Sequence, residues 1–261
     1  MKLSLVVTTY NRHDALLLVL QSIESQSLPP SEVIIADDGS NSDTQKIIND
    51  FQKKTNLSIK HSWQKDKGFR VAKSRNKAIA KSNGDYIVLI DGDMILHSEF
   101  IKDHIHHAEQ GFFVQGSRAF LTKFMTRKIL LEGVKNFNFL SGGLQNRKNT
   151  IHSRLLSNFF SKKKNHLLGI KSCNMAFFKE DCININGFNN DIEGWGREDS
   201  EFAIRLINNN IKRKTIRFNS LQFHLWHNQS ERNSLEINDA ILKKTIDSKS
   251  KWAANGINKF T

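Results

Sequence analysis

Two carboxylates stand near the end of an apolar segment, at a spacing that suits a metal ion. The segment YIVLIDGDMIL, residues 86–96, is apolar enough to be buried, yet it contains Asp91 and Asp93 with Gly92 between them. A buried carboxylate without a partner is costly. An Asp-x-Asp pair at a strand end can bind a hard divalent cation that also holds a diphosphate, and glycine would let the backbone turn tightly there. Because Asp-Gly-Asp also occurs in ordinary turns, the pair needs support from other residues.

A third carboxylate and a basic helix are expected close to this pair. ADDGSNSDT contains Asp38, which follows a second apolar segment and could accept hydrogen bonds from a nucleotide base or ribose. Helix capping is the alternative, although later residues of the same segment can cap without it. KGFRVAKSRNKAI supplies Arg70, Lys73 and Arg75, which could approach a nucleotide or simply form a helical surface.

The segment EGWGREDSEFAIRL combines an aromatic side chain with two acids. Trp195 lies between two glycines, which suggests that its ring serves as an exposed stacking surface on a flexible loop, and Glu198 and Asp199 follow at the start of a predicted helix. Carboxylates in a first helical turn also interact favourably with the helix dipole, so a capping role is the alternative.

Short apolar strands alternate with helices through the first hundred residues. This alternation predicts an α/β fold with a mostly parallel sheet, whose ligands lie beyond the carboxyl ends of the strands. The expected strands are 3–9, 32–38, 57–63 and 86–91, and the expected helices are 14–25, 43–54 and 71–82. The later expected elements are a helix at 99–109, strands at 112–118 and 173–179, a helix at 199–210, strands at 212–218 and 221–227, and a helix from about 234 to 254.

Basic residues are concentrated in the middle of the chain. Of a formal net charge of +13, the segment 118–171 carries +11, with twelve Lys or Arg residues against the single acid Glu132. This segment either faces solvent or binds anionic lipid headgroups or an acidic or phosphorylated acceptor. Large apolar residues among its cations are typical of an interfacial element. No zinc-finger spacing or RNA-binding aromatic signature occurs, so nucleic acid is not an expected partner.

Cysteine usage and hydropathy predict a cytosolic protein. Cys173 and Cys182 show no metal-type spacing and are expected to be buried free thiols. No apolar run approaches the roughly 18 residues that a membrane span needs, and the first apolar run is too short for a signal-peptide core.

The motifs together resemble a known family. VVTTYNR, IIADDGS, KGFRVAKSRNKAI and YIVLIDGDM resemble family 2 glycosyltransferases of the GT-A fold. Residues 170–228 are similar to the C-terminal part of galactosyltransferases and chondroitin-polymerase-type enzymes, which have a Gly-Trp-Gly-x-Glu-Asp run followed some thirty residues later by a histidine. The basic middle and the C-terminal helix lie outside the resemblance. It implies a nucleotide-sugar-binding subdomain (1–96), an acceptor-binding subdomain (97–230, with the insertion at about 118–171) continuous with its sheet, and a C-terminal helical extension (231–261).

The resemblance also implies roles for individual donor-side residues. Thr8 and Tyr10 match positions that line the base, Asp38 matches the carboxylate that reads uracil, and Arg75 matches a basic residue near the base and diphosphate. Asp91 matches a residue of the metal motif that also lies near the ribose.

Its remaining roles concern the metal and the acceptor. Asp93 matches the direct metal ligand, and His224 and His227 are both candidates for the metal-binding histidine, with His227 preferred because it ends its strand. Asp199 matches the catalytic base and Glu198 an acid that holds the acceptor or donor sugar. Trp195 is expected to contact the acceptor.

The implied function is inverting, metal-dependent transfer of a sugar from a UDP-sugar to a hydroxyl of a glycan or glycolipid, in bacterial surface polysaccharide or lipopolysaccharide synthesis. Mn²⁺ suits a ligand set that includes histidine better than Mg²⁺ does. The protein would act in the cytoplasm or on the inner face of the cell membrane. The alternative is a non-catalytic glycan- or membrane-binding protein with the same fold. A nucleotidyltransferase or a nicotinamide dehydrogenase would need a glycine-rich motif after the first strand, and none occurs.

Overall fold

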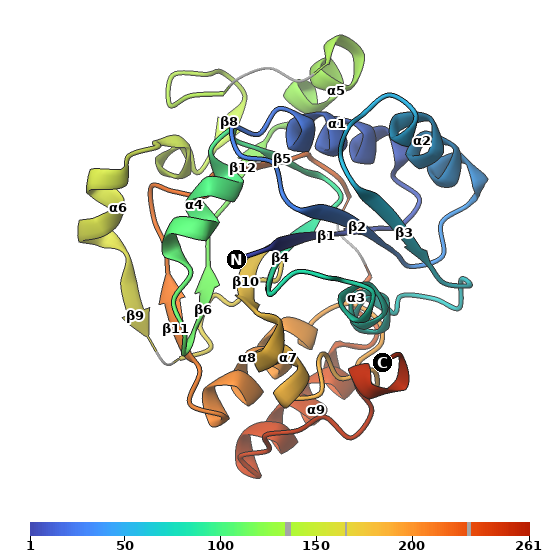
Figure 1. The fold of residues 1–261 in the computed structure, drawn as a ribbon, viewed down its shortest axis with the longest axis vertical. Coiled ribbons are helices and arrows are strands. Elements are labelled where there is room, and N and C mark those ends of the chain that lie inside the picture. Colours follow the sequence, from blue (N-terminus) through green and yellow to red (C-terminus); the bar gives the residue numbers. More distant parts are fainter. Residues whose placement is uncertain (134–136, 165, 229–230) are drawn as a thin grey trace.

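The fold is built on two sheets. The computed structural model describes residues 1–261 apart from 134–136, 165 and 229–230. The larger sheet has eight strands in the order β3-β2-β1-β4-β10-β6-β11-β9 (Figure 1). These strands are β1 (Leu3–Thr9), β2 (Glu32–Asp37), β3 (Ile59–Trp63), β4 (Tyr86–Asp91), β6 (Phe112–Gln115), β9 (Lys162–Lys164), β10 (Asn174–Phe178) and β11 (Lys212–Thr215).

The first four strands are parallel, as the alternating sequence pattern predicts. Strand β10 then enters antiparallel between β4 and β6, which confirms the expected return of this segment to the sheet. The large sheet therefore continues from the first hundred residues into the second half of the chain. This arrangement agrees with the GT-A fold that the resemblance implies.

Helices cover both faces of the large sheet, and the alternating side chains of its strands fill the two layers between. On one face, apolar side chains of β1 and β4 pack against α1 (His13–Glu24), α2 (Ser42–Gln52) and α4 (Phe100–His107). On the other face, the opposite set of strand side chains packs against α3 (Val71–Ala80), α7 (Lys179–Asn184) and α8 (Glu198–Asn208). Burial of apolar side chains on both faces explains why these strands read as continuous apolar runs.

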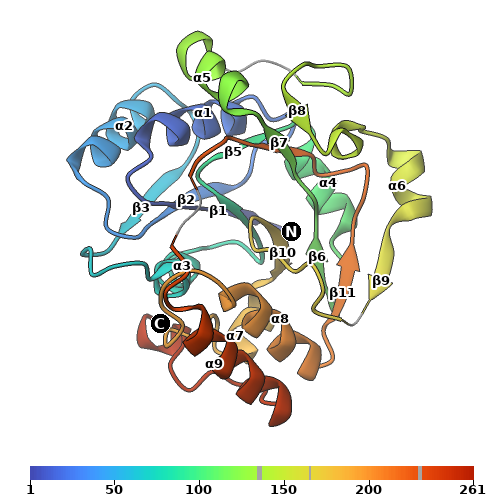
Figure 2. The same ribbon diagram turned by 180° about the vertical axis from the view of Figure 1, so that it is seen from behind.

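A second, four-stranded sheet was not predicted from the sequence. It comprises β5 (Met94–Leu96), β12 (Gln222–His224), β7 (Ala119–Leu121) and β8 (Leu144–Gln145), in that order. Figure 2 shows it beside α1 and α5 (Lys123–Glu132), with which it shares a third apolar cluster. Strand β5 begins directly after Asp93, so the chain passes from one sheet to the other at the paired acids.

The basic segment 118–171 folds into short elements for which the sequence predicted no regular structure. They are β7, α5, β8, the 3₁₀ helix η1 (Arg147–Thr150), α6 (Arg154–Phe160) and β9. The C-terminal helix α9 (Leu235–Asp247) is shorter than expected and is followed by the 3₁₀ helix η2 (Ile257–Lys259). Cys173 and Cys182 are buried free thiols, as predicted. Within the described residues, no helix combines the length and apolarity that a membrane crossing requires.

Candidate active site

An open cleft of about 1310 Å³ lies at the carboxyl ends of β1 and β4. Every residue to which the family resemblance assigned a role lines this cleft: Thr8, Tyr10, Asp38, Arg75, Asp91, Asp93, Trp195, Glu198, Asp199, His224 and His227. They come from both halves of the chain, so the fold brings the donor-side and acceptor-side motifs onto the walls of one cavity.

Arg75, on α3, connects the two sides of the cleft. Its Nε donates to Thr8 Oγ1 at 3.2 Å, its Nη1 to Glu198 Oε1 at 3.1 Å and its Nη2 to Asp91 Oδ1 at 3.2 Å. A guanidinium offers several donors in a fixed plane, so one side chain can hold a hydroxyl and two carboxylates. Arg70 and Lys73, which the sequence analysis grouped with Arg75, are not among the cleft residues.

Asp38 is buried and already accepts two hydrogen bonds. Gln64 Nε2 donates to Oδ1 and the Arg70 backbone N–H donates to Oδ2, both at 2.6 Å. Burial raises the pKa of Asp38, although these two donors oppose the rise. Carboxylate oxygens have further lone pairs, so Asp38 can still accept from a ligand. Its neighbour Asp37 accepts from backbone N–H groups and His61 and so organises the turn after β2.

Tyr10 presents an exposed ring at the same end of the cleft. Its hydroxyl donates to Asp66 Oδ2 at 2.9 Å, which fixes the ring in place. The loop that carries Asp66 can approach the turn after β2 only because Gly39 in that turn has no side chain. A Cβ on Gly39 would lie 2.5 Å from the Cα of Asp66, and the φ of Gly39 is +103°. The glycine thereby positions the partner of Tyr10.

Asp93, His224 and His227 form a cluster with the geometry of a metal site. Asp93 Oδ2 lies 3.4 Å from Nε2 of His224 and 3.3 Å from Nε2 of His227. The two Nε2 atoms are themselves 3.2 Å apart. The sequence treated the histidines as alternatives, whereas the structure brings both to Asp93.

The surroundings of the cluster direct its ligand atoms inward. His227 Nδ1 donates to the carbonyl oxygen of Asn228 at 2.6 Å, so its Nε2 has a free lone pair when the ring is neutral. His224 packs edge-on against Phe120, with ring centroids 5.4 Å apart. Burial acts to raise the pKa of Asp93, but the nearby imidazoles outweigh it and hold that pKa below its usual range.

These residues fit a divalent cation. The second oxygen of Asp93, Oδ1, is buried and finds no hydrogen-bond partner in the described part of the chain. The two Nε2 atoms, 3.2 Å apart, can share one hydrogen bond or, together with Asp93, bind one metal ion. One oxygen and two nitrogen ligands suit Mn²⁺ better than Mg²⁺, which prefers oxygen alone.

Asp91 lies outside this cluster. Its Oδ1 accepts from Arg75 instead, and a ligand role for it stays a prediction. Burial and the charge of Asp93 raise the pKa of Asp91, whereas Arg75 opposes the rise. Gly92 does not have a positive φ. It is needed because a Cβ there would lie 2.9 Å from the carbonyl oxygen of Thr8 on the adjacent strand.

The loop around Trp195 has an unusual backbone and is anchored by α9. Gly194, Gly196 and Arg197 have φ values of +73°, +100° and +78°. The buried Asn238 of α9 donates through Nδ2 to the carbonyl oxygens of Glu193 and Gly196, both at 3.0 Å. The sequence suggested a flexible loop; these bonds instead hold it against the C-terminal helix. The Trp195 ring, 38% exposed, faces the cleft.

Glu198 and Asp199 begin α8 directly after this loop. Desolvation, with a further contribution from the negative charge of Glu198, raises the pKa of Asp199 to about 7; Arg75 and the hydrogen bonds from Ser200 oppose the rise. A carboxylate with a pKa near neutrality is a more effective general base than an ordinary aspartate.

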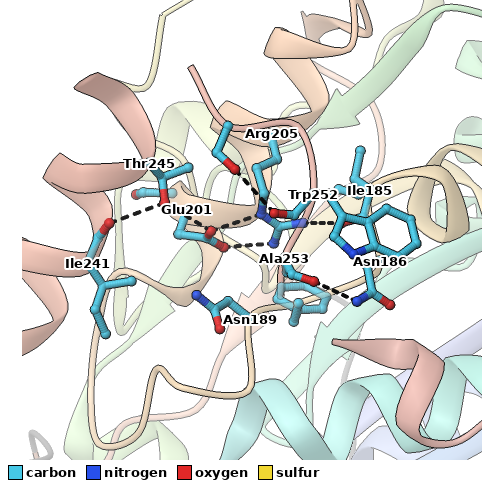
Figure 3. Close-up of polar contacts among 12 residues, drawn as sticks. Ile185, Asn186, Asn189, Glu201, Arg205, Ile241, Thr245, Trp252 and Ala253 are labelled. Atoms are coloured by element: carbon cyan, nitrogen blue, oxygen red, sulfur yellow. Dashed lines mark hydrogen bonds and ion pairs between the residues drawn. The ribbon is translucent and has the colours of Figure 1, made fainter. Parts of the chain in front are cut away.

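A buried ion pair fixes α8 in the fold (Figure 3). Glu201 and Arg205 pair through two hydrogen bonds of 2.7 and 2.8 Å, and both side chains are almost fully buried. Arg205 also donates to the carbonyl oxygen of Ile185, and Thr245 of α9 donates to Glu201. The helix that carries Glu198 and Asp199 is thus tied to the segment after α7 and to α9.

Sequence reasoning missed five cations that line the cleft: Arg12, Arg118, Lys171, Arg197 and Arg232. Arg118 and Lys171, at the two ends of the basic segment, line it together with Phe120. The composition of the segment indicated an anionic partner, but nothing in its spacing distinguished these two residues from the other ten cations.

The cleft brings together the end of the parallel sheet, a cluster of one carboxylate and two imidazoles that fits a divalent cation, and a carboxylate pair at a helix start. Comparison with known proteins identifies the family. Residues 4–178 match glycosyl transferase family 2, and residues 154–227 match the domain described as the N-terminal domain of galactosyltransferase. The chain belongs to glycosyl transferase family 2, as the motifs indicated.

Curated relatives include two polysaccharide synthases. Hyaluronan synthase of Pasteurella multocida is 29% identical over 82% of this chain and 24% of its own length. Chondroitin synthase of Escherichia coli is 26% identical over 78% of this chain and 32% of its own length. The chain thus spans only about a quarter to a third of the length of these relatives.

Solved structures share the fold. TarS 1–349 of S. aureus in complex with UDP superimposes with a TM-score of 0.64 and 17% identity, over 94% of this chain and 65% of that chain. Mannosyltransferase PcManGT from Pyrobaculum calidifontis in complex with GDP-Man and Mn²⁺ superimposes with a TM-score of 0.63 and 15% identity, over 94% of this chain and 64% of that chain. At these identities the likeness establishes the GT-A fold alone.

Proposed function

We propose that this protein transfers a sugar from a UDP-sugar to a hydroxyl group of a glycan or glycolipid, with inversion at the anomeric carbon. The observation that carries the proposal is one cleft lined by both the Asp93–His224–His227 cluster and the Glu198–Asp199 pair. The names of the relatives, which include polysaccharide synthases and a GalNAc(5)-diNAcBac-PP-undecaprenol beta-1,3-glucosyltransferase of Campylobacter jejuni, support a surface-glycan role.

On the donor side, Tyr10 offers a ring face for the base and Asp38 an acceptor for a ring N–H. Asp93, His224 and His227 would hold Mn²⁺ or Mg²⁺. When bound, the ion would neutralise charge that develops on the departing diphosphate. Arg75 keeps the carboxylates of Asp91 and Glu198 from repelling that diphosphate, because its guanidinium offsets their charge. Residues 1–96 would supply most of this donor site.

On the acceptor side, Asp199 would take the proton from the attacking hydroxyl. The oxygen of that hydroxyl forms a bond to the anomeric carbon while the bond from that carbon to the diphosphate breaks. Glu198 would orient a sugar hydroxyl, and Trp195 would stack on the acceptor ring. Asp199 would be the one base on the acceptor side, and the sequence shows no second carboxylate placed to act as a nucleophile. A single displacement with inversion is therefore the simplest mechanism for this site. Residues 97–230 would bind the acceptor, and 231–261 would support them.

Calorimetry with UDP tests this function. We expect UDP to bind in Mn²⁺ and to lose most of its affinity in chelator or in Asp93→Ala. A screen of UDP-sugars with Mn²⁺, read by donor hydrolysis, would then identify the sugar. UDP affinity that is the same with Mn²⁺ and with chelator would contradict metal-dependent donor binding and favour a non-catalytic protein with this fold.

We also propose that the basic segment 118–171 contacts an anionic membrane surface. Its support is a set of exposed large apolar side chains among the cations: Phe124, Leu131, Phe139, Leu140, Leu155, Phe159, Phe160 and Leu168. Of the lysines in β9, Lys163 is already paired with Glu109 at 2.7 Å, so the helix α5 offers the better test.

We expect the protein to sediment with phosphatidylglycerol vesicles at low salt, and salt to release it by screening. The double variant Phe124→Ser, Leu131→Ser should weaken this binding, whereas Ile237→Ser, at an exposed position on α9, should not. Equal sedimentation with phosphatidylcholine, or none with either lipid, would oppose the proposal.

A further inference from the structure

A smaller pocket of about 260 Å³ lies beside the cleft and shares four lining residues with it. The shared residues are Arg118, Phe120, Lys171 and Cys173. Its charged lining consists of Arg118, Lys171, Arg213 and Arg217, and no carboxylate occurs among its described lining residues. We call these four cations the cationic pocket.

No ion pair within the described residues neutralises the charges of the cationic pocket, although Arg118 and the Asp91 carboxylate attract each other electrostatically. Arg213 is buried and, within the described residues, its hydrogen bonds all go to backbone carbonyl oxygens, including that of Leu168 at 2.8 Å. Arg118 donates to the sulfur of Cys173 at 3.1 Å, and burial raises the pKa of that thiol to about 12, so the sulfur is neutral. Across the described residues, none of the four cations belongs to an ion pair.

Two of these guanidinium groups also have an unused donor. The Nε atoms of Arg118 and Arg213 are buried, and neither meets an acceptor in the described ranges of the chain. Burial lowers the pKa of Arg213, which means that its charge is poorly solvated. Buried charge without a partner is costly, and an anion in the pocket would remove that cost. Guanidinium groups bind carboxylates and phosphates through paired hydrogen bonds, with a geometry that lysine alone does not provide.

The cationic pocket adjoins the metal cluster. The Arg118 guanidinium lies over the Phe120 ring, 4.9 Å from its centroid. The same Phe120 ring also packs against His224 of the metal cluster. Because the donor diphosphate would be held by the metal cluster, the neighbouring cations remain available for a different anion.

We propose that the cationic pocket binds an anionic group of the acceptor, a carboxylate or a phosphate, next to the sugar whose hydroxyl reacts. This assignment rests on the proposed glycosyltransferase function and narrows it to acceptors that carry negative charge. A neutral acceptor would leave four cations unmatched at the edge of the site. The pocket therefore acts as a specificity element for acidic glycans or phosphate-linked acceptors.

The test uses simple anions and a charge-matched control. The pocket variant is Lys171→Gln with Arg217→Gln, both at exposed positions. The control is Arg127→Gln with Lys212→Gln, also exposed and outside both cavities, so that both variants lose two charges. Binding of glucuronate, glucose and inorganic phosphate is measured by protein NMR titration for wild type and both variants, without nucleotide.

We expect glucuronate or phosphate to bind wild type and the control alike, and to bind the pocket variant at least fivefold more weakly, with glucose binding weakly and unchanged. Loss for glucuronate alone indicates a uronic acid acceptor, and loss for phosphate alone a phosphate-linked one. Wild type that prefers neither anion over glucose, or equal anion binding in both variants, would overturn the assignment. UDP calorimetry on the same samples reports separately on the glycosyltransferase function, so failure of one is distinguishable from failure of the other.

Discussion

Arg75 and Glu198 are 123 residues apart in the chain, yet their side chains are joined by a hydrogen bond of 3.1 Å. Arg75 belongs to α3, which packs on the large sheet, and Glu198 begins α8. Because Arg75 also donates to Asp91, the donor and acceptor sides of the cleft share one cation. Its removal should therefore affect both stability and the electrostatics of the base.

Arg75→Gln should destabilise the protein by about 2 kcal/mol, because two half-buried carboxylates lose their charged partner. Arg75 also lowers the pKa of Asp199, so the variant should raise that pKa further. Chemical denaturation measures the first effect. Lys73→Gln, on the same helix but outside the cleft, is the matched control; a loss of stability as large in the control would show that helix charge, not the pairing, is responsible.

Both histidines of the metal cluster should bind the ion. We expect His224→Ala and His227→Ala each to lower Mn²⁺ affinity by at least about tenfold, since loss of even an outer contact of a metal site has that effect. Titration followed by electron paramagnetic resonance measures the affinity, with His61→Ala as control because His61 pairs with Asp37 away from the cluster. Unchanged affinity in one of the two variants would leave a single histidine ligand.

Asp199 should set the pH dependence of turnover. Since its pKa is raised to about 7 by burial and Glu198, the deprotonated base becomes available as pH rises through neutrality, and kcat should rise with it. Asp199→Asn should abolish this limb and lower kcat by about a hundredfold or more, the scale of a lost general base, with little change in UDP affinity. The comparison requires pH profiles of kcat for both proteins at saturating donor; if UDP affinity falls as far as kcat, Asp199 binds the donor instead.

The sequence predicted the parallel strands and the cleft residues for a physical reason. Buried strands such as β1 are continuous apolar runs, and polar residues that end them must meet at one edge of a parallel sheet. Strands of two or three residues carry no detectable period. The second sheet, with β7 and β8, therefore could not be read from the chain.

Features that depend on contacts between residues far apart in the chain could not be predicted from the sequence either. The sequence favoured His227 and held His224 as the alternative, because only the turn after β12 shows that both imidazoles reach Asp93. The cationic pocket combines residues from 118 to 217 that no local pattern connects. The role of α9 also depends on distant contacts. The sequence predicted only a helical extension, whereas Asn238 of this helix holds the loop of Trp195.

Asn238 should act as a positioning residue for that loop. Asn238→Leu keeps a similar volume but leaves the carbonyl oxygens of Glu193 and Gly196 without this buried donor, at a cost of about 1–3 kcal/mol. Three residues of the loop, Gly194, Gly196 and Arg197, have positive φ values, so the loop depends on such external bonds. We expect faster hydrogen exchange across residues 190–200 and unchanged exchange across 71–80, measured by mass spectrometry.

Kinetics would separate this positioning role from a general loss of stability. Acceptor KM should rise more than donor KM in Asn238→Leu, because Trp195 lies on the acceptor side of the proposed site. Asn208→Leu is the matched control: its Nδ2 also donates to a C-terminal backbone carbonyl, that of Ser250, at 2.7 Å, but away from the loop. If both variants raise exchange at 190–200 equally, α9 merely stabilises the fold, and the specific link between Asn238 and the Trp195 loop is wrong.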